Sequence, residues 1–210
     1  MPTAREALLN AALTALTDLP WSGIRMVDVA FAAGVSRQTL YNEFGSKDGL
    51  ARALLRREAD AYLHGVDRLL LGDRSASSAE RLVAVAEWTV GEARARPLLR
   101  ALLTGCWGER LPAPRAAHPA ARVVGVPAQR RADAGHPAPA DLAAAVRDRS
   151  FAAFEQGARS RTKEEAADLA QRCELAVRLA LSCVVAPAPE GVGQLVRNAV
   201  SGSSPRAAGR

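Results

Sequence analysis

The residues best suited to chemistry with another molecule lie in one short stretch, from Arg37 to Asn42. Arg37 and Gln38 carry a guanidinium and an amide, the groups that pair with the edges of guanine and adenine in the DNA major groove. Thr39 and Tyr41 carry hydroxyls suited to phosphate oxygens. On a helix these side chains and Asn42 face largely outward, and the first turn of such a helix is the part that meets base edges.

No catalytic arrangement accompanies this stretch. The histidines and cysteines lack the spacing of a metal site or of a nucleophile with its base: they are His64, His118, His136, Cys106, Cys173 and Cys183. We therefore expect no catalytic residue, no metal and no cofactor. The cysteines are expected to be small buried apolar residues.

The neighbouring residues predict the elements that position the stretch. Apolar residues recur with helical spacing over 26–33, which predicts a two-turn amphipathic helix. Gly34 suits the left-handed backbone conformation that ends a helix. Ser36 can cap a second helix by accepting from backbone N–H groups of its first turn. Leu40 and Phe44, four residues apart, would form the inner face of that helix.

This segment resembles the DNA-binding domain of the TetR family of bacterial transcriptional regulators. The resemblance rests on Ala33-Gly34-Val35-Ser36, Thr39-Leu40-Tyr41, Phe44 and Ser46-Lys47, which have the order and spacing of the family. It implies an all-α protein, with an N-terminal three-helix helix-turn-helix domain and a C-terminal helical bundle for ligand binding and dimerisation. It also implies that Lys47 contacts a backbone phosphate from the start of the next long helix.

The chain departs from the family pattern at the start of the helix before the turn. Similar proteins usually have Ser or Thr there, whereas this chain has Ile24 and Arg25. We expect Arg25 to contact a phosphate through its charge instead. The complete set of expected DNA contacts is Arg25, Ser36, Arg37, Gln38, Thr39, Tyr41, Asn42 and Lys47.

The net charge of +6 does not mark the DNA-binding segment. Residues 1–50 contain four basic and five acidic side chains, so this segment is slightly acidic. DNA binding would therefore depend on a few placed contacts and on dimerisation. The N-terminus shows no signal peptide, and the longest apolar run, 179–188, is too short to span a bilayer. A cytoplasmic protein with no membrane partner is expected.

The rest of the chain predicts a helical body. Further helices are expected at 4–18, 47–71, 78–94, 97–107, 139–157, 162–186 and 190–200. Residues 1–46 would form the DNA-binding domain and 47–202 the effector-binding and dimerisation domain. Six of the twelve prolines lie within 108–139, which predicts a long mobile loop there, and 203–210 is expected to be a tail.

Two sites are expected in the body. A small-molecule pocket is predicted where large apolar groups gather with little charge; its candidate residues are Tyr62, Val66, Trp88, Thr89, Leu103 and Trp107. The helix at 162–186 is apolar on almost all sides, and in the resembled family the last two long helices form the dimer interface. The candidate interface residues are Phe154, Leu169, Cys173, Val177, Ala180 and Val184.

The function favoured by these observations is that of a ligand-responsive transcriptional regulator. Repression is the usual behaviour of the family, so the chain is expected to bind a palindromic operator in double-stranded DNA as a homodimer. A small, mainly apolar effector would release it. Two alternatives remain: a small-molecule-binding protein without DNA function, and, less favoured, an enzyme.

Overall fold

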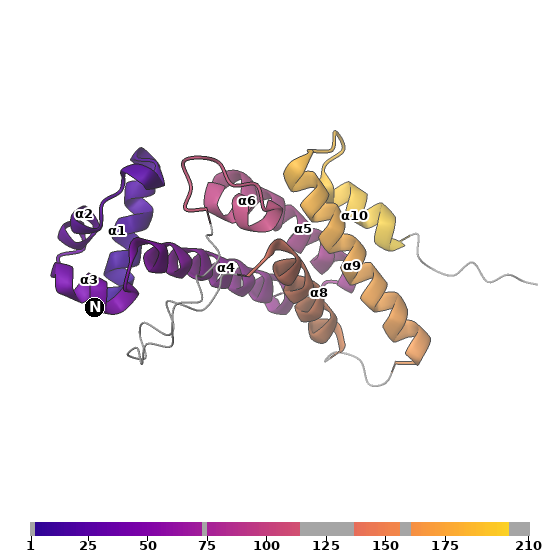
Figure 1. The fold of residues 1–210 in the computed structure, drawn as a ribbon. Helices are drawn as coiled ribbons and strands as arrows, with labels where there is room; N and C mark the ends of the chain where they lie inside the picture. Colours follow the sequence, from indigo (N-terminus) through magenta and orange to yellow (C-terminus); the bar gives the residue numbers. More distant parts are fainter. Residues whose placement is uncertain (1–2, 73–74, 114–136, 156–160, 202–210) are drawn as a thin grey trace, which may run out of the picture. The chain divides into compact units, whose positions relative to one another are not determined.

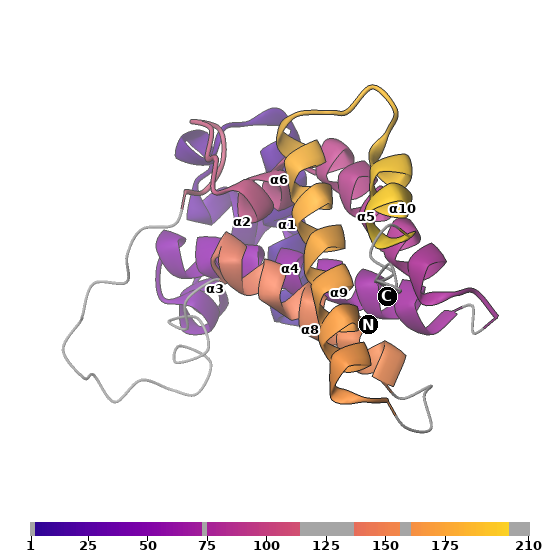
Figure 2. The same cartoon turned by 90° about the vertical axis from the view of Figure 1, so that its right-hand side faces the viewer.

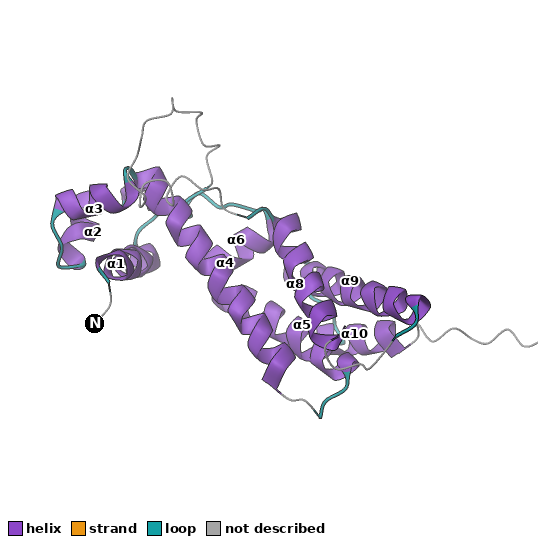
Figure 3. Cartoon of the chain, turned by 90° about the horizontal axis from the view of Figure 1, so that it is seen from below, coloured by secondary structure: helices purple, strands orange, loops and turns teal. Residues whose placement is uncertain are grey.

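The computed structural model describes residues 3–72, 75–113, 137–155 and 161–201. Every regular element in these ranges is helical, as expected (Figure 3). The described residues divide into two compact units, one within 1–58 and 106–137 and the other within 59–105 and 138–210. The elements are α1 (Ala4–Asp18), the short 3₁₀ helix η1 (Trp21–Gly23), α2 (Met26–Ala32), α3 (Arg37–Phe44), α4 (Lys47–Gly72), α5 (Ser78–Ala95), α6 (Pro97–Thr104), α8 (Pro139–Glu155), α9 (Lys163–Val185) and α10 (Val192–Ser201).

In the first unit, α1, α2 and α3 pack against one another around a shared apolar core (Figure 1). Leu8 of α1 and Leu40 of α3 are fully buried, and Val29 of α2 is almost so. Gly34 joins α2 to α3 with φ at +67°, a conformation that favours glycine, as the sequence predicts. The core holds α3 by its apolar side and leaves its polar side exposed.

The connection between α1 and α2 is held by a distant segment that directly follows α6. The Trp21 N–H donates to the Arg110 carbonyl at 2.9 Å, and the Arg110 guanidinium donates to the Asp18 carbonyl at 3.1 Å. This segment therefore belongs to the same compact unit as the three helices.

In the second unit, α5 packs against α9 and α10, and α9 also packs against α8 (Figures 1 and 2). Local signals set the helix starts. Ser77 and Thr162 each accept a hydrogen bond from the third residue of the helix that follows, whose glutamate side chain bonds back to the cap backbone. Such reciprocal caps fix where α5 and α9 begin.

Some boundaries differ from those expected. The helix predicted over 97–107 ends at Thr104, because Gly105 takes the left-handed conformation with φ at 72° and closes the helix. Most of the proline-rich segment 108–139, and the whole of 203–210, lie outside the described residues. α4 is continuous from Lys47 to Gly72 and so contributes to both units. None of the described helices has the length and apolar character needed to cross a membrane.

Candidate DNA-binding surface and ligand cavity

The start of α3 is organised by Ser36. Its hydroxyl accepts from the Thr39 backbone N–H at 3.0 Å and lies 2.8 Å from the Thr39 hydroxyl. Ser36 therefore caps the helix as predicted, and the cap satisfies a backbone donor of the first helical turn. The same contact brings two residues of the expected DNA-contact set together at one end of α3.

Four further polar side chains of α3 form two pairs, each with its members one helical turn apart. The Gln38 amide nitrogen donates to the Asn42 amide oxygen at 2.8 Å. The Arg37 guanidinium carbon lies 5.6 Å from the centre of the Tyr41 ring, within the range of a cation–π contact. Gln38, Arg37 and Asn42 are exposed, so α3 presents a polar and partly ordered surface to solvent.

Two expected phosphate contacts are engaged within the chain. Arg25 forms two hydrogen bonds to the Asp28 carboxylate, at 2.7 and 3.0 Å, and this partner raises the pKa of Arg25. Lys47 donates to the Ser22 carbonyl at 3.3 Å, and its ammonium lies 5.2 Å from the centre of the Trp21 ring. Burial lowers the pKa of Lys47.

Sequence reasoning missed both arrangements. The spacing of Asp28 three residues after Arg25 was a readable signal for the first, since residues at this spacing are neighbours on a helix. The contact of Lys47 with η1 joins residues far apart in the sequence and had no such signal.

Part of the chain is similar in sequence to known regulatory proteins. Residues 8–54 match the family described as "Bacterial regulatory proteins, tetR family". A 101-residue region is 40% identical to the HTH-type transcriptional regulator AlkX of Mycobacterium tuberculosis. Residues 8–54 are thus a segment of the TetR family type. The match to AlkX covers 48% of this chain and spans about half, 47%, of that relative.

Solved structures resemble the fold of this chain over most of its length. The TetR family repressor AlkX from a Dietzia species has a TM-score of 0.54 at 23% identity, over 95% of this chain and 92% of its own. A tetR-family transcriptional regulator from Streptomyces coelicolor has a TM-score of 0.53 at 19% identity, over 95% of this chain and 79% of its own. At these identities the likeness concerns the fold alone.

A small cavity of about 10 Å³ lies in the second unit of the chain. Three of the six expected ligand-binding residues, Tyr62, Thr89 and Leu103, line it. The other lining residues include Val146 and Ser150 of α8, which the sequence did not single out. The cavity is enclosed by α4, α5, α6, α8 and α9.

The other three expected ligand-binding residues lie elsewhere. Val66 is fully buried but does not line the cavity. Trp88 stacks on Tyr62 with ring centres 5.5 Å apart and planes 4° from parallel. Its indole also covers Gly65, where an added Cβ would stand 2.1 Å from the ring. Trp107 belongs to the first unit and is not a lining residue.

The six residues expected at the dimer interface are not on the surface of the chain. All are 7% exposed or less; they are Phe154, Leu169, Cys173, Val177, Ala180 and Val184. Val177 and Ala180 line the cavity. The physical reason is that α9 packs against α5, α8 and α10, so its most apolar side faces the core of its own chain.

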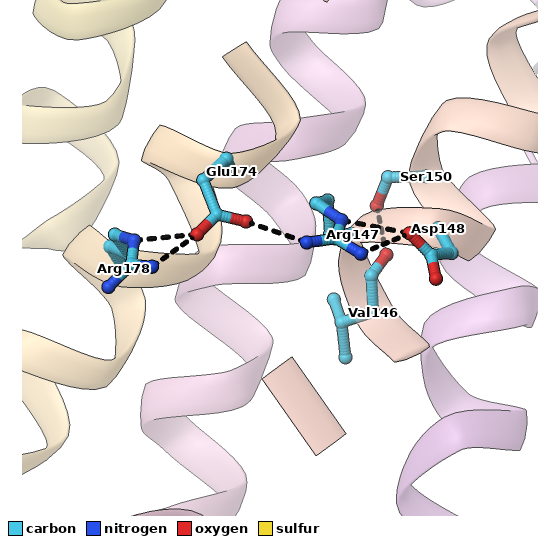
Figure 4. Close-up of polar contacts among 6 residues, drawn as sticks. All are labelled: Val146, Arg147, Asp148, Ser150, Glu174 and Arg178. Atoms are coloured by element: carbon cyan, nitrogen blue, oxygen red, sulfur yellow. Dashed lines mark hydrogen bonds and ion pairs between the residues drawn. The ribbon is translucent and has the colours of Figure 1, made fainter. Parts of the chain in front are cut away.

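A different stripe of α9 is accessible. Residues at alternating spacings of four and three along one side are exposed or half-buried, which is the pattern of one helix face: they are Gln171, Leu175, Arg178, Ser182 and Val185. Beside this stripe, Glu174 joins the two last long helices, as Figure 4 shows. Its carboxylate lies 2.6 Å from Arg178 of α9 and 3.5 Å from Arg147 of α8.

Cys173 does not have the properties of a redox sensor. Its side chain is fully buried, and burial raises the pKa of its thiol to about 12. A reactive cysteine needs an accessible thiol with a lowered pKa. Among the described residues, no group of three or more His, Cys, Asp or Glu side chains is placed to hold a metal ion.

Proposed function

We propose that this protein is a transcriptional regulator that binds a palindromic operator as a homodimer, represses transcription, and is released by a small, mainly apolar effector. The observation that carries the proposal is the exposed polar face of α3, held on an apolar core and capped by Ser36. The match of residues 8–54 to the tetR family of regulatory proteins supports the same conclusion. In a symmetric dimer, two such helices read half-sites about 34–36 Å apart, or somewhat more.

The pairing of Gln38 with Asn42 favours adenine as the base read by Gln38. An amide nitrogen has two hydrogens, and Asn42 accepts only one of them. The second hydrogen and the amide oxygen of Gln38 match the acceptor and donor that adenine presents in the major groove. Asn42 therefore acts as a support that orients the Gln38 amide toward the base.

The accessible stripe on α9 supports the homodimer. Val185 on this stripe is 62% exposed, so its side chain is available to a second copy. A two-fold axis beside α8 and α9 would cover it with the same stripe of a second copy, as an isologous interface requires. The ion pairs around Glu174 would then lie at the edge of the contact (Figure 4).

Helix α4 couples effector binding to DNA binding in this proposal. The helix carries Tyr62, which lines the cavity, and begins at Lys47, which holds η1 beside the DNA-binding helices. A displacement of Tyr62 is thereby transmitted along a continuous helix. The effector releases DNA only if it binds the non-binding conformation more tightly than the binding one.

The test is selection of preferred sites from duplexes with randomised half-sites, followed by affinity measurements. We expect a palindromic site bound by a dimer. Gln38→Ala should cost about 1–3 kcal/mol at one base pair of each half-site and relax the preference there. Lys47→Ala should weaken all sites evenly. An unchanged base preference in the Gln38→Ala variant would remove this residue from the recognition surface.

A further inference from the structure

The chemistry of the cavity wall restricts the molecule it can accept. None of the fourteen lining residues is charged, and only three of them, Tyr62, Thr89 and Ser150, carry hydroxyl groups. The others present hydrocarbon, including four alanines: Ala86, Ala143, Ala176 and Ala180. A carboxylate in this cavity would lose its hydration without gaining a cationic partner, which is strongly unfavourable.

The hydrogens of all three hydroxyls are already committed. The Thr89 hydroxyl donates to the Val85 carbonyl at 2.7 Å, and it has only one hydrogen. The contact of 3.1 Å between the Tyr62 and Thr89 oxygens therefore requires Tyr62 to be the donor. The Ser150 hydroxyl donates to the Val146 carbonyl at 2.8 Å.

The hydroxyl oxygens of the cavity wall can still accept hydrogen bonds, although their hydrogens are already donated. The oxygens of Tyr62 and Ser150 keep lone pairs to which no other described residue donates a hydrogen bond. A ligand hydroxyl can donate to them without breaking an existing hydrogen bond. A ligand carbonyl could gain a hydrogen bond only by taking a hydrogen from an existing bond, so its gain is largely cancelled.

We propose that the effector is an uncharged, mainly aliphatic alcohol, and that the cavity selects it over the corresponding ketone and carboxylate by offering acceptors but no free donors. This inference rests on the proposed function, because it names the ligand of the proposed effector site. The proposed function requires only a mainly apolar effector, which does not distinguish an alcohol from a ketone or a carboxylate.

Entry of such a ligand requires the wall to move. The cavity of about 10 Å³ holds no more than about one water molecule. Tyr62 is in stacking contact with Trp88, so displacement of the Tyr62 ring changes the surroundings of the indole. Trp88 fluorescence therefore reports ligand entry, and a Trp88→Phe variant identifies its share of the signal from the three tryptophans.

The experiment compares four probes of equal chain length: 1-octanol, octane, 2-octanone and octanoate. Binding is followed by tryptophan fluorescence of the full chain, and operator affinity is measured under the same conditions. We expect 1-octanol to bind about tenfold more tightly than 2-octanone, a difference of about 1.4 kcal/mol. Octanoate at neutral pH should bind at least a hundredfold more weakly than 1-octanol.

Two variants test the origin of the selectivity. Ser150→Ala and Tyr62→Phe each remove one of the two acceptors and little volume. At least one of them should reduce the preference for 1-octanol over octane several-fold while leaving octane binding within about twofold. Selectivity unchanged in both variants, tighter binding of 2-octanone or octanoate, or no binding by any of the four probes would overturn the inference.

The outcomes separate this inference from the proposed function. Alcohol-selective binding that leaves operator affinity unchanged keeps the ligand class and removes the regulatory role of the site. Release of the operator by octanoate or 2-octanone keeps the regulatory role and removes the ligand class.

Discussion

The Trp88 indole lies over Gly65, so a substitution of Gly65 tests the packing next to the cavity. In Gly65→Ala, the new Cβ would stand 2.1 and 2.3 Å from two carbons of the Trp88 indole. Carbon atoms in contact are normally about 3.5–4.0 Å apart, so the ring must move by more than 1 Å. The movement would disturb the stacking of Trp88 on Tyr62.

The expected magnitude follows from two opposing effects. Replacing glycine by alanine inside a helix stabilises the folded state by about 1 kcal/mol. Overpacking of this kind costs about 1–3 kcal/mol. Gly91→Ala supplies the matched control, because Gly91 lies inside α5 and a Cβ there would meet nothing within 4 Å. The free energy of unfolding of Gly65→Ala should therefore fall below that of Gly91→Ala by about 1–3 kcal/mol.

Urea denaturation of both variants gives this difference directly. Repeating the pair in a Trp88→Leu background isolates the clash, because the penalty at Gly65 should largely vanish when the indole is absent. If Gly65→Ala proves as stable as Gly91→Ala with Trp88 present, the indole is not seated over Gly65 and the assignment of Trp88 as a reporter of the cavity fails.

Two further predictions concern the dimer and the buried thiol. Val185→Glu should give a monomer in sedimentation equilibrium, with weakened operator binding. The control is Leu71→Glu, also at an exposed apolar residue, which should remain dimeric. A dimeric Val185→Glu variant would place the interface elsewhere. Burial raises the pKa of the Cys173 thiol from 9.0 to about 12. As the pH rises, the thiol therefore loses its proton in the unfolded chain before it does so in the folded chain. The free energy of unfolding is thus highest below pH 9 and declines between pH 9 and 12. From pH 8 to 10 the free energy of unfolding should fall by about 1.4 kcal/mol more than in Cys173→Ala; equal slopes in the two proteins would contradict the raised pKa.

Helix positions could be predicted closely because their signals are local. Ser36 caps α3, and Gly34 closes the end of α2 with its positive φ. Both roles depend only on neighbouring residues. Gly105 shows the limit of such reasoning, since it ends α6 three residues before the expected end at Trp107. A glycine interrupts a helical pattern in some places and is tolerated in others, and the sequence alone did not distinguish them.

The candidate sites were less predictable because they depend on which helices meet. Tyr62, Thr89 and Leu103 were found as cavity residues because large groups gathered in helices that follow one another. Val177 was assigned to a dimer interface because α9 is apolar on almost all sides, and an apolar pattern does not say whether its own chain or a second copy covers each face. That choice requires the positions of α5, α8 and α10.

The hydrogen bonds between Arg110 and the connection from α1 to α2 mean that the compact unit of α1, α2 and α3 is not one continuous piece of the sequence. A fragment ending within α4 would leave the Trp21 N–H and the Asp18 carbonyl to water and would lack the segment that fixes this turn. Moving α1, α2 and α3 with this turn intact into another protein would therefore require two pieces of chain, the first helices and the residues that follow α6. The turn between α1 and α2 thus depends on a segment that is distant in sequence.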